Sequence, residues 1–309
     1  MGRYVVRRLL QMIPVFIGTT FLIYFMVYKL GGDPIERLFG DKGADPVFVE
    51  QMREQLHLND PLIVQYWNYL TNLLQGDFGT TIQGLSVADE LKQAFPVSIR
   101  LALIAFAIEV VFGIGLGLLA GLRRGRFIDS VVLVTTLVVI SIPVFVLGFV
   151  LQYWLGLKWH VFDATADVGT PTWSQLMLPG IVLGSLSLAY VARLTRTSIA
   201  ENLRADYVRT ATAKGLPRRR VVTRHLLRNS LIPVVTFLGA DLGSLMAGAI
   251  VTEGIFNVNG VGRLIYLSVV RKESATVVGA VAALVMIYLV MNLIVDLLYA
   301  VLDPRIRYA

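Results

Sequence analysis

The sequence contains no cysteine and only 3 histidines among its 309 residues. The absence of cysteine excludes a disulfide framework, a thiolate metal site and a cysteine nucleophile. The histidines, His57, His160 and His225, are isolated in separate segments of the chain. We therefore expect no metal site.

Common enzyme motifs are missing as well. The sequence has no G-x-x-x-x-G-K-[ST] phosphate loop, no G-x-S-x-G nucleophile elbow and no H-E-x-x-H helix. Without a phosphate loop, the chain is not expected to bind and hydrolyse ATP by that route. Without the other motifs, nothing favours a hydrolase or a zinc protease. We predict that the chain is not an enzyme and binds no cofactor of its own.

Apolar residues are what the sequence has in excess. They make up 56% of the chain, and the mean hydropathy is +0.68, whereas soluble domains are roughly 45 to 50% apolar. The apolar residues fall into blocks near the roughly 20 residues that a membrane-spanning helix needs. These blocks are residues 9–30, 99–122, 128–155, 177–191, 230–251 and 277–301. The sequence thus predicts an all-α polytopic membrane protein of about six transmembrane helices.

The basic residues indicate the orientation of these spans. With the amino terminus inside, 18 of the 28 Lys and Arg residues fall in cytoplasmic segments, ten of them in the loop 193–228. Positive charge gathers on the cytoplasmic side of membrane proteins. We expect both termini in the cytoplasm. This bias also explains most of the +7 net charge without nucleic-acid binding.

The segment 31–97 is predicted to be a small folded extracytoplasmic insert. Asp45-Pro46 and Asp60-Pro61 each place a helix-capping residue before a proline that suits the first helical position. Gly76 is suited to end the second of these helices. The insert is therefore expected to be helical and ordered.

A third short helix is predicted in this insert, starting at Ser86 and Asp89, which resemble a capping box, and ending before Pro96. The second helix carries large apolar and aromatic side chains: Leu62, Tyr66, Trp67, Tyr69 and Leu70. These side chains suit the membrane surface, an external partner or the other spans. We favour packing on the spans.

Two spans carry small residues at four-residue spacing. Gly113, Gly117 and Gly121 form one such series. Gly239, Gly243 and Ala247 form the other. Small residues allow membrane helices to approach closely. We predict helix packing at both faces; a functional alternative is that these smooth contacts let the helices slide or tilt when a pore opens.

Three acidic residues, Glu109, Asp241 and Asp296, fall inside predicted spans. A charge at the centre of a span costs about 2.5 to 3.5 kcal/mol, so these side chains should face the protein interior or water. They suit pore-lining or interhelical anchors, or alternatively the proton relay of a secondary transporter. The absence of a basic residue near any span centre speaks against the relay.

The loop 193–228 combines an apolar stripe with a Gly-x-Pro turn, and a loop that is only basic needs neither feature. Ile199, Leu203, Tyr207 and Ala211 recur every four residues, which predicts one apolar stripe on a helix. Gly215 suits the left-handed position that ends a helix, and Pro217, two residues on, suits the first turn of the next. The prediction is a rigid helix-turn-helix that can transmit force to the adjoining spans.

This loop resembles that of a known family. The stretch D-Y-V-R-T-A-T-A-K-G-L-P-R-R-R at 206–220, followed by R-N-S-L-I-P at 228–233, is similar to the cytoplasmic "EAA" loop of ABC-importer permeases, and more narrowly to the dipeptide and oligopeptide branch. Further short matches follow in the family's order: G-D-P at 32–34, N-D-P-L with Q-Y at 59–66, G-D-F-G at 76–79, L-P-G at 178–180, E-G-I-F at 253–256, G-V-G at 260–262 and L-D-P-R-I-R-Y at 302–308.

The chain departs from the family pattern at a few positions. Arg209, Thr210 and Ala211 stand where the name-giving Glu-Ala-Ala is found, although this fits the peptide branch. Asn259 stands where that branch usually has proline, and residues 271–273 replace a common Arg-Asp pair. The last two departures fall on the predicted extracytoplasmic side, so they bear on substrate and receptor and not on energy coupling.

The resemblance implies a type I ABC importer permease fold in a bacterial inner membrane. The first tail and span would occupy 1–30, the insert 31–97, the permease core 98–302 and a cytoplasmic tail 303–309. The implied partners are a homologous second permease, two cytoplasmic ATPase subunits or one fused pair, an extracytoplasmic binding protein that delivers peptide, and membrane lipid. ATP and magnesium would be bound by the ATPases. The implied coupling residues are Asp206, Arg209, Thr210, Ala211, Lys214, Gly215, Leu216 and Pro217.

Two other classes remain open from the residues. One is a stand-alone proton-coupled transporter that uses Glu109, Asp241 and Asp296; the other is a membrane scaffold that transports nothing. The cargo is not readable from the sequence, because selectivity can lie in the binding protein and relatives in this branch also move nickel complexes, haem, glutathione or sugars.

Overall fold

The protein is described by a computed structural model that covers residues 2–30, 46–55, 59–81, 84–167 and 169–302. In these ranges the chain is helical, and its β-structure is limited to a single bridge between Thr80 and Ser86. The chain divides into two compact units. Unit 1 comprises Met1–Ser98 and Asn259–Ala309, and unit 2 comprises Ile99–Val258. Unit 1 thus combines the first and last parts of the sequence. The positions of the apolar blocks along the sequence did not predict this combination.

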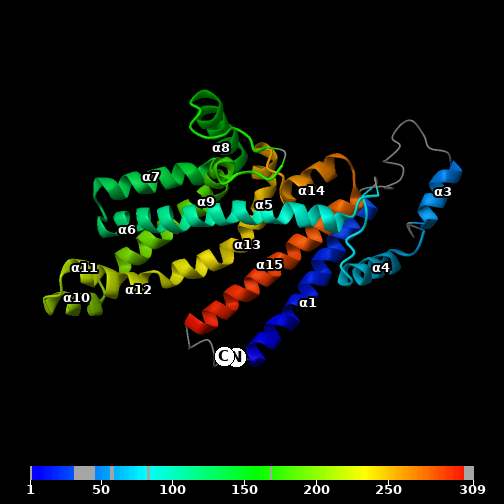
Figure 1. The fold of residues 1–309 in the computed structure, drawn as a ribbon. Coiled ribbons are helices and arrows are strands. Elements are labelled where there is room, and N and C mark those ends of the chain that lie inside the picture. Colours follow the sequence, from blue (N-terminus) through cyan, green and yellow to red (C-terminus); the bar gives the residue numbers. More distant parts are fainter. Residues whose placement is uncertain (1, 31–45, 56–58, 82–83, 168, 303–309) are drawn as a thin grey trace. The chain divides into compact units, whose positions relative to one another are not determined.

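Unit 1 is built on two long apolar helices that lie side by side and run in opposite directions (Figure 1). These are α1 (Gly2–Phe25), which a π-helical turn extends to Leu30, and α15 (Ser274–Leu302). The remaining helices of the unit are α3 (Pro46–Gln55), α4 (Leu62–Leu74), the first part of α5 (Val87–Ile108) and α14 (Val261–Val270).

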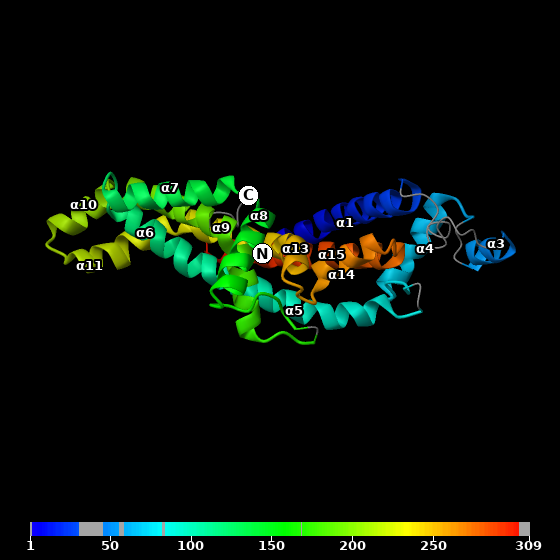
Figure 2. The ribbon, with the colours of Figure 1, turned by 90° about the horizontal axis from the view of Figure 1, so that it is seen from above.

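Unit 2 is arranged around one long central helix, α9 (Trp173–Asn202), which contacts most other helices of the unit. The helices before it are the end of α5, the π-helical turn Glu109–Gly113, α6 (Ile114–Leu122), α7 (Phe127–Ser141) and α8 (Val144–Leu151), the last continued by a π-helical stretch to Lys158. The helices after it are α10 (Asp206–Ala213), α11 (Arg218–Arg220), the π-helical turn Val221–Leu226, α12 (Leu227–Ser230) and α13 (Ile232–Ile255). Figure 2 shows α6 and α7 lying beside α9.

Five helical runs of the described chain are long and apolar enough to cross a membrane, and a sixth candidate is a bent pair. The prediction of about six membrane helices agrees with this. The runs are Val5–Leu30, Val87–Leu122, Trp173–Asn202, Ile232–Ile255 and Ser274–Val295. Most are longer than the apolar blocks, because helical hydrogen bonding continues into polar residues at their ends.

The third predicted span, 128–155, is not one straight helix. α7 and the helix Val144–Lys158 meet at an angle of 104°. Ile142 between them is extended (φ −92°, ψ 125°), as the residue before a proline prefers. Pro143 then precedes the first residue of α8 and has no N–H to continue α7. The proline therefore breaks the helix, although the apolar pattern of the sequence continues through it.

The predicted short helix ending before Pro96 is also wrong. α5 begins after Ser86, whose carbonyl accepts from the N–H groups of Asp89 (3.1 Å) and Glu90 (3.3 Å), and it continues through Pro96. Apolar side chains on both sides of the proline, Ala94 and Val97, are buried. Packing thus compensates for the backbone hydrogen bond that a proline inside a helix removes.

Candidate functional site

The loop 193–228 forms a sharp turn that begins where α10 ends. Gly215 has a positive φ of 73°. Its N–H donates to the carbonyl of Thr212 (2.9 Å), and the N–H of Leu216 donates to the carbonyl of Ala211 (3.3 Å). This pair of bonds is the Schellman motif, which satisfies carbonyls at a helix end and requires a left-handed residue. Gly215 therefore takes the left-handed conformation predicted for it.

The residue after this turn, Pro217, lies just before α11 and not within its first turn (φ −60°, ψ 141°). Its carbonyl accepts from the N–H of Arg220 (2.8 Å) and of Val221 (3.1 Å). The proline therefore fixes the extended residue from which the next helix starts.

An apolar core holds this turn to the membrane helices of unit 2. Its buried members are Ile199, Val208, Ala211, Val221 and Leu226, and Leu118, Leu122, Leu203 and Leu216 pack against them. These residues come from α6, the end of α9, α10 and the π-helical turn after α11. α10 is therefore packed against α6 and the end of α9 by apolar side chains.

The predicted single stripe on one helix is wrong in detail. α9 ends at Asn202, and α10 begins only at Asp206. Because the break shifts the phase of the helix, Val208 enters the core in place of Tyr207. Tyr207 is exposed and donates a 2.6 Å hydrogen bond to Oδ1 of Asn202. Sequence periodicity does not detect a phase shift of this kind.

The outward face of the turn is polar and exposed. Most of the coupling residues implied by the family lie there: Asp206, Arg209, Thr210, Lys214, Gly215 and Pro217. Arg209 and Asp206 approach to 3.8 Å, which is a weak contact between exposed charges. Ala211 and Leu216 lie underneath in the core. Six of the implied coupling residues are therefore exposed, and the other two pack in the apolar core.

A buried ion pair lies near this core and was not predicted. Nε and Nη2 of Arg196 donate to the two carboxylate oxygens of Asp129, each at 2.8 Å, and the N–H of Gly125 donates to the same carboxylate at 2.9 Å. The Asp129 side chain is 4% exposed. This bidentate ion pair joins α7 to α9, and Arg196 lies six residues before the end of α9. Its partners are 67 positions apart in the sequence, so no local pattern reveals it.

The first glycine series lies directly against α9. A Cβ atom built on Gly113 would lie 2.7 Å from Val191, and one on Gly121 would lie 2.7 Å from Ile199. On Gly117 it would lie 2.5 Å from both the Ala192 carbonyl oxygen and the Thr195 Cβ. Real Cβ atoms do not approach so closely, so the helices are in contact at the backbone.

Two further glycines make a second close contact that sequence reasoning missed. Cβ atoms on Gly180 and Gly184 of α9 would lie 2.5 Å from Ile104 and 2.8 Å from the Ala105 carbonyl oxygen of α5. Their four-residue spacing was a usable signal. In the second predicted series, Gly243 is buried and Gly239 half-buried on α13.

Two of the three predicted membrane acids lie together in unit 2. Glu109 is fully buried, with Asp241 and Ser187 as interacting neighbours. Both carboxyl oxygens of Glu109 and Oδ2 of Asp241 are buried without a hydrogen-bond partner within the described residues. Asp296 belongs to α15, and its side chain lies outside the described part of the structure. A grouping of all three acids therefore stays a prediction.

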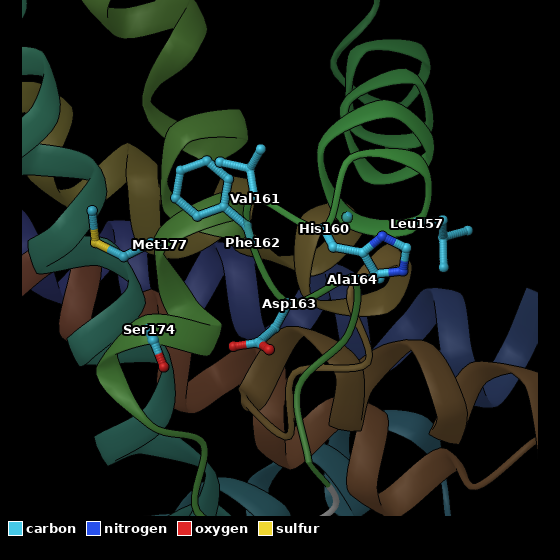
Figure 3. A pocket seen from close by; sticks show the side chains of 9 residues that line it. Leu157, His160, Val161, Phe162, Asp163, Ala164, Ser174 and Met177 are labelled. Carbon is cyan, nitrogen blue, oxygen red and sulfur yellow. The ribbon is translucent and has the colours of Figure 1, made fainter.

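A pocket of 540 Å³ lies beside the loop that follows the bent pair. His160, Asp163 and Ser174 supply its polar groups among apolar neighbours (Figure 3). In Figure 3 the Asp163 and Ser174 side chains lie on one side of the pocket lining, and the His160 ring lies on the other side, beside Leu157. No sequence motif marked these residues, and the described residues between 159 and 172 have no regular structure.

Comparison with known proteins identifies the class. The family model described as "binding-protein-dependent transport system inner membrane component" matches residues 113–308, and the model of its N-terminal region matches residues 1–101. The chain belongs to this family. It is therefore a type I ABC-importer permease.

Curated relatives match the permease over its whole length. The glutathione transport system permease protein GsiC of Salmonella choleraesuis (strain SC-B67) is 38% identical over 311 residues. GsiC of Escherichia coli (strain K12) is 37% identical over 311 residues. Each comparison covers 100% of both chains. The permease is accordingly a multi-pass inner-membrane protein and a transport component, in agreement with the resemblance seen in the loop 193–228.

Proposed function

We propose that this permease forms half of the translocation pathway for short peptides in an ATP-driven importer. A homologous second permease would form the other half, two ATPase subunits would dock on the exposed face of α10 and the turn that follows, and a binding protein would deliver cargo. Both termini and the loop 193–228 would lie in the cytoplasm. The GsiC relatives are named for glutathione, which is itself a short peptide, and this supports peptide cargo.

The observation that carries the proposal is the construction of the 206–217 turn. Six exposed residues form a compact face around Lys214 and Gly215, while Ala211 and Leu216 are fixed in an apolar core shared with α6 and α9. A partner that grips the exposed face would move the core with it. Closure of the ATPases on ATP would thereby bias the membrane helices toward one access state, since coupling is a difference in affinity between two states.

The test replaces Gly215 with valine in the assembled importer. A Cβ at Gly215 meets nothing within 4 Å, so the main cost is the left-handed backbone, about 1 to 2 kcal/mol for an L-residue. We expect loss of labelled-glutathione uptake and of binding-protein-stimulated ATPase activity, with unchanged amounts of the permease in the membrane.

Gly215→Asn is the matched control, because asparagine adopts the left-handed region more readily than other non-glycine residues. It should retain more coupling than Gly215→Val. Normal uptake by the valine variant would contradict the proposed coupling role. Uptake by the purified chain alone under a proton gradient, without ATP, would instead support the stand-alone transporter.

A further inference from the structure

Helix α4 of unit 1 has three distinct sides. One side is buried and includes Tyr66, Leu70 and Leu73. A second side is apolar yet exposed: Ile63 is 75% exposed, Trp67 62% and Leu74 76%. The third side carries the exposed amides of Asn68 and Asn72. A helix that remains apolar beyond its buried side, and then turns polar, is typical of helices that lie in a membrane interface.

Hydrogen bonds attach α4 to the middle of the first membrane helix. The Tyr66 hydroxyl donates to the carbonyl of Ile17 (2.9 Å) and contacts the Thr20 hydroxyl at 2.8 Å. Ile17 and Thr20 lie near the centre of the apolar run Val5–Leu30. The insert helix therefore lies alongside the membrane span and not beyond its end.

Aromatic packing and a contact to α15 complete this attachment. The ring of Tyr66 packs edge to face on Phe21, with centroids 5.1 Å apart. The Tyr69 hydroxyl donates to the carbonyl of Val278 in α15 at 3.4 Å. α4 is thus held against both long helices of unit 1.

An apolar groove of 380 Å³ runs between these three helices. Its walls include Ile13 and Phe16 of α1, Leu70 and Leu74 of α4, and Met286 and Leu289 of α15. Leu74 belongs to the exposed apolar side of α4, and Ile13 (53% exposed) and Met286 (39% exposed) belong to apolar runs that cross the membrane. The exposed side of α4 is therefore continuous with the lipid-facing surface of the spans.

We propose that α4 is embedded in the lipid bilayer alongside α1, with Ile63, Trp67 and Leu74 facing lipid, and that the groove beside it holds one lipid acyl chain. The groove has only apolar side chains in its walls, which fits a hydrocarbon chain, whereas protein interfaces carry about one hydrogen bond per 100 to 200 Å². This proposal rests on the membrane location of the family and is independent of cargo and coupling.

Tryptophan fluorescence tests the position of α4. The chain has 4 tryptophans, so changing Trp154, Trp159 and Trp173 to phenylalanine, together with the tryptophans of the partner subunits, leaves Trp67 as the reporter. The assembled importer is placed in nanodiscs of ordinary or dibrominated phosphatidylcholine, and aqueous iodide is the second quencher. We expect brominated lipid to quench Trp67 strongly and iodide to quench it weakly.

The matched control moves the reporter by one residue to the polar side, with Trp67→Phe and Asn68→Trp in the same background. Brominated lipid should quench this reporter less than it quenches Trp67, and iodide should quench it more than it quenches Trp67. Strong iodide quenching of Trp67 would overturn the proposal by placing the exposed apolar side in water. Protection of Trp67 from both quenchers would overturn it by showing a protein partner on this face.

Lipid retention tests the groove. Ile13→Trp introduces an indole into the space that the acyl chain would occupy, whereas Leu22→Trp changes an exposed leucine of α1 (56% exposed) that does not line the groove. Native mass spectrometry of the detergent-solubilised importer should show one bound phospholipid fewer for Ile13→Trp and no change for Leu22→Trp. Equal lipid counts for wild type and Ile13→Trp would overturn the acyl-chain site.

Discussion

Two acidic side chains of unit 2 are buried in opposite ways. Asp129, in the first turn of α7, receives two donors from Arg196 and one from Gly125. Glu109, in the π-helical turn between α5 and α6, has no hydrogen bond to either oxygen among the described residues. A fully partnered buried charge fixes geometry, whereas an unpartnered one costs free energy. The contrast indicates a rigid contact between α7 and α9, and a polar site in the π-helical turn Glu109–Gly113 that does not hold the fold together.

The packing of α9 also depends on backbone contact with α6, and Gly117→Leu should disrupt this contact. The new side chain would meet the Ala192 carbonyl and Thr195, and overpacking costs about 1 to 3 kcal/mol or more. We expect a clear fall in the thermal unfolding midpoint of the detergent-solubilised permease. Gly115→Leu is the matched control on the same helix, because a Cβ there meets nothing within 4 Å. Equal midpoints for the two variants would contradict close contact between α6 and α9.

The ion pair itself is tested by Arg196→Met. Removing one partner of a buried pair leaves an uncompensated charge and costs about 3 to 5 kcal/mol. The exposed pair of Arg209 and Asp206 provides the comparison, since Arg209→Met should change stability by about 0 to 1 kcal/mol. The free energy of unfolding in denaturant measures both. Combining Arg196→Met with Asp129→Asn should cost less than the sum of the single changes, and strict additivity would show that the pair is not coupled.

The predictable part of this structure was local. The turn at Gly215 was predictable because a Schellman motif depends on a few neighbouring residues. The close contact of Gly117 followed from four-residue spacing, although its partner α9 did not. The break at Pro143 had a local signal that the apolar run 128–155 obscured, and the shift from Tyr207 to Val208 had none.

What sequence could not supply was pairing between distant segments. Arg196 and Asp129 meet only because α7 and α9 pack side by side. The same limit applies to α4: its aromatic residues were recognised, but which of them face α1 and which remain exposed depends on the tertiary position of Tyr66 against Ile17.

Glu109→Gln should have the smallest effect on stability. The amide has nearly the same shape as the carboxyl group, whose oxygens make no hydrogen bond within the described residues. Stability should therefore stay within about 1 kcal/mol of the wild type, since the change breaks no hydrogen bond. Asp129→Asn, the same chemical change at a partnered carboxylate, should lower the free energy of unfolding. A loss at Glu109 as large as that at Asp129 would show that Glu109 is paired in the assembled importer, through a group that this chain alone does not provide.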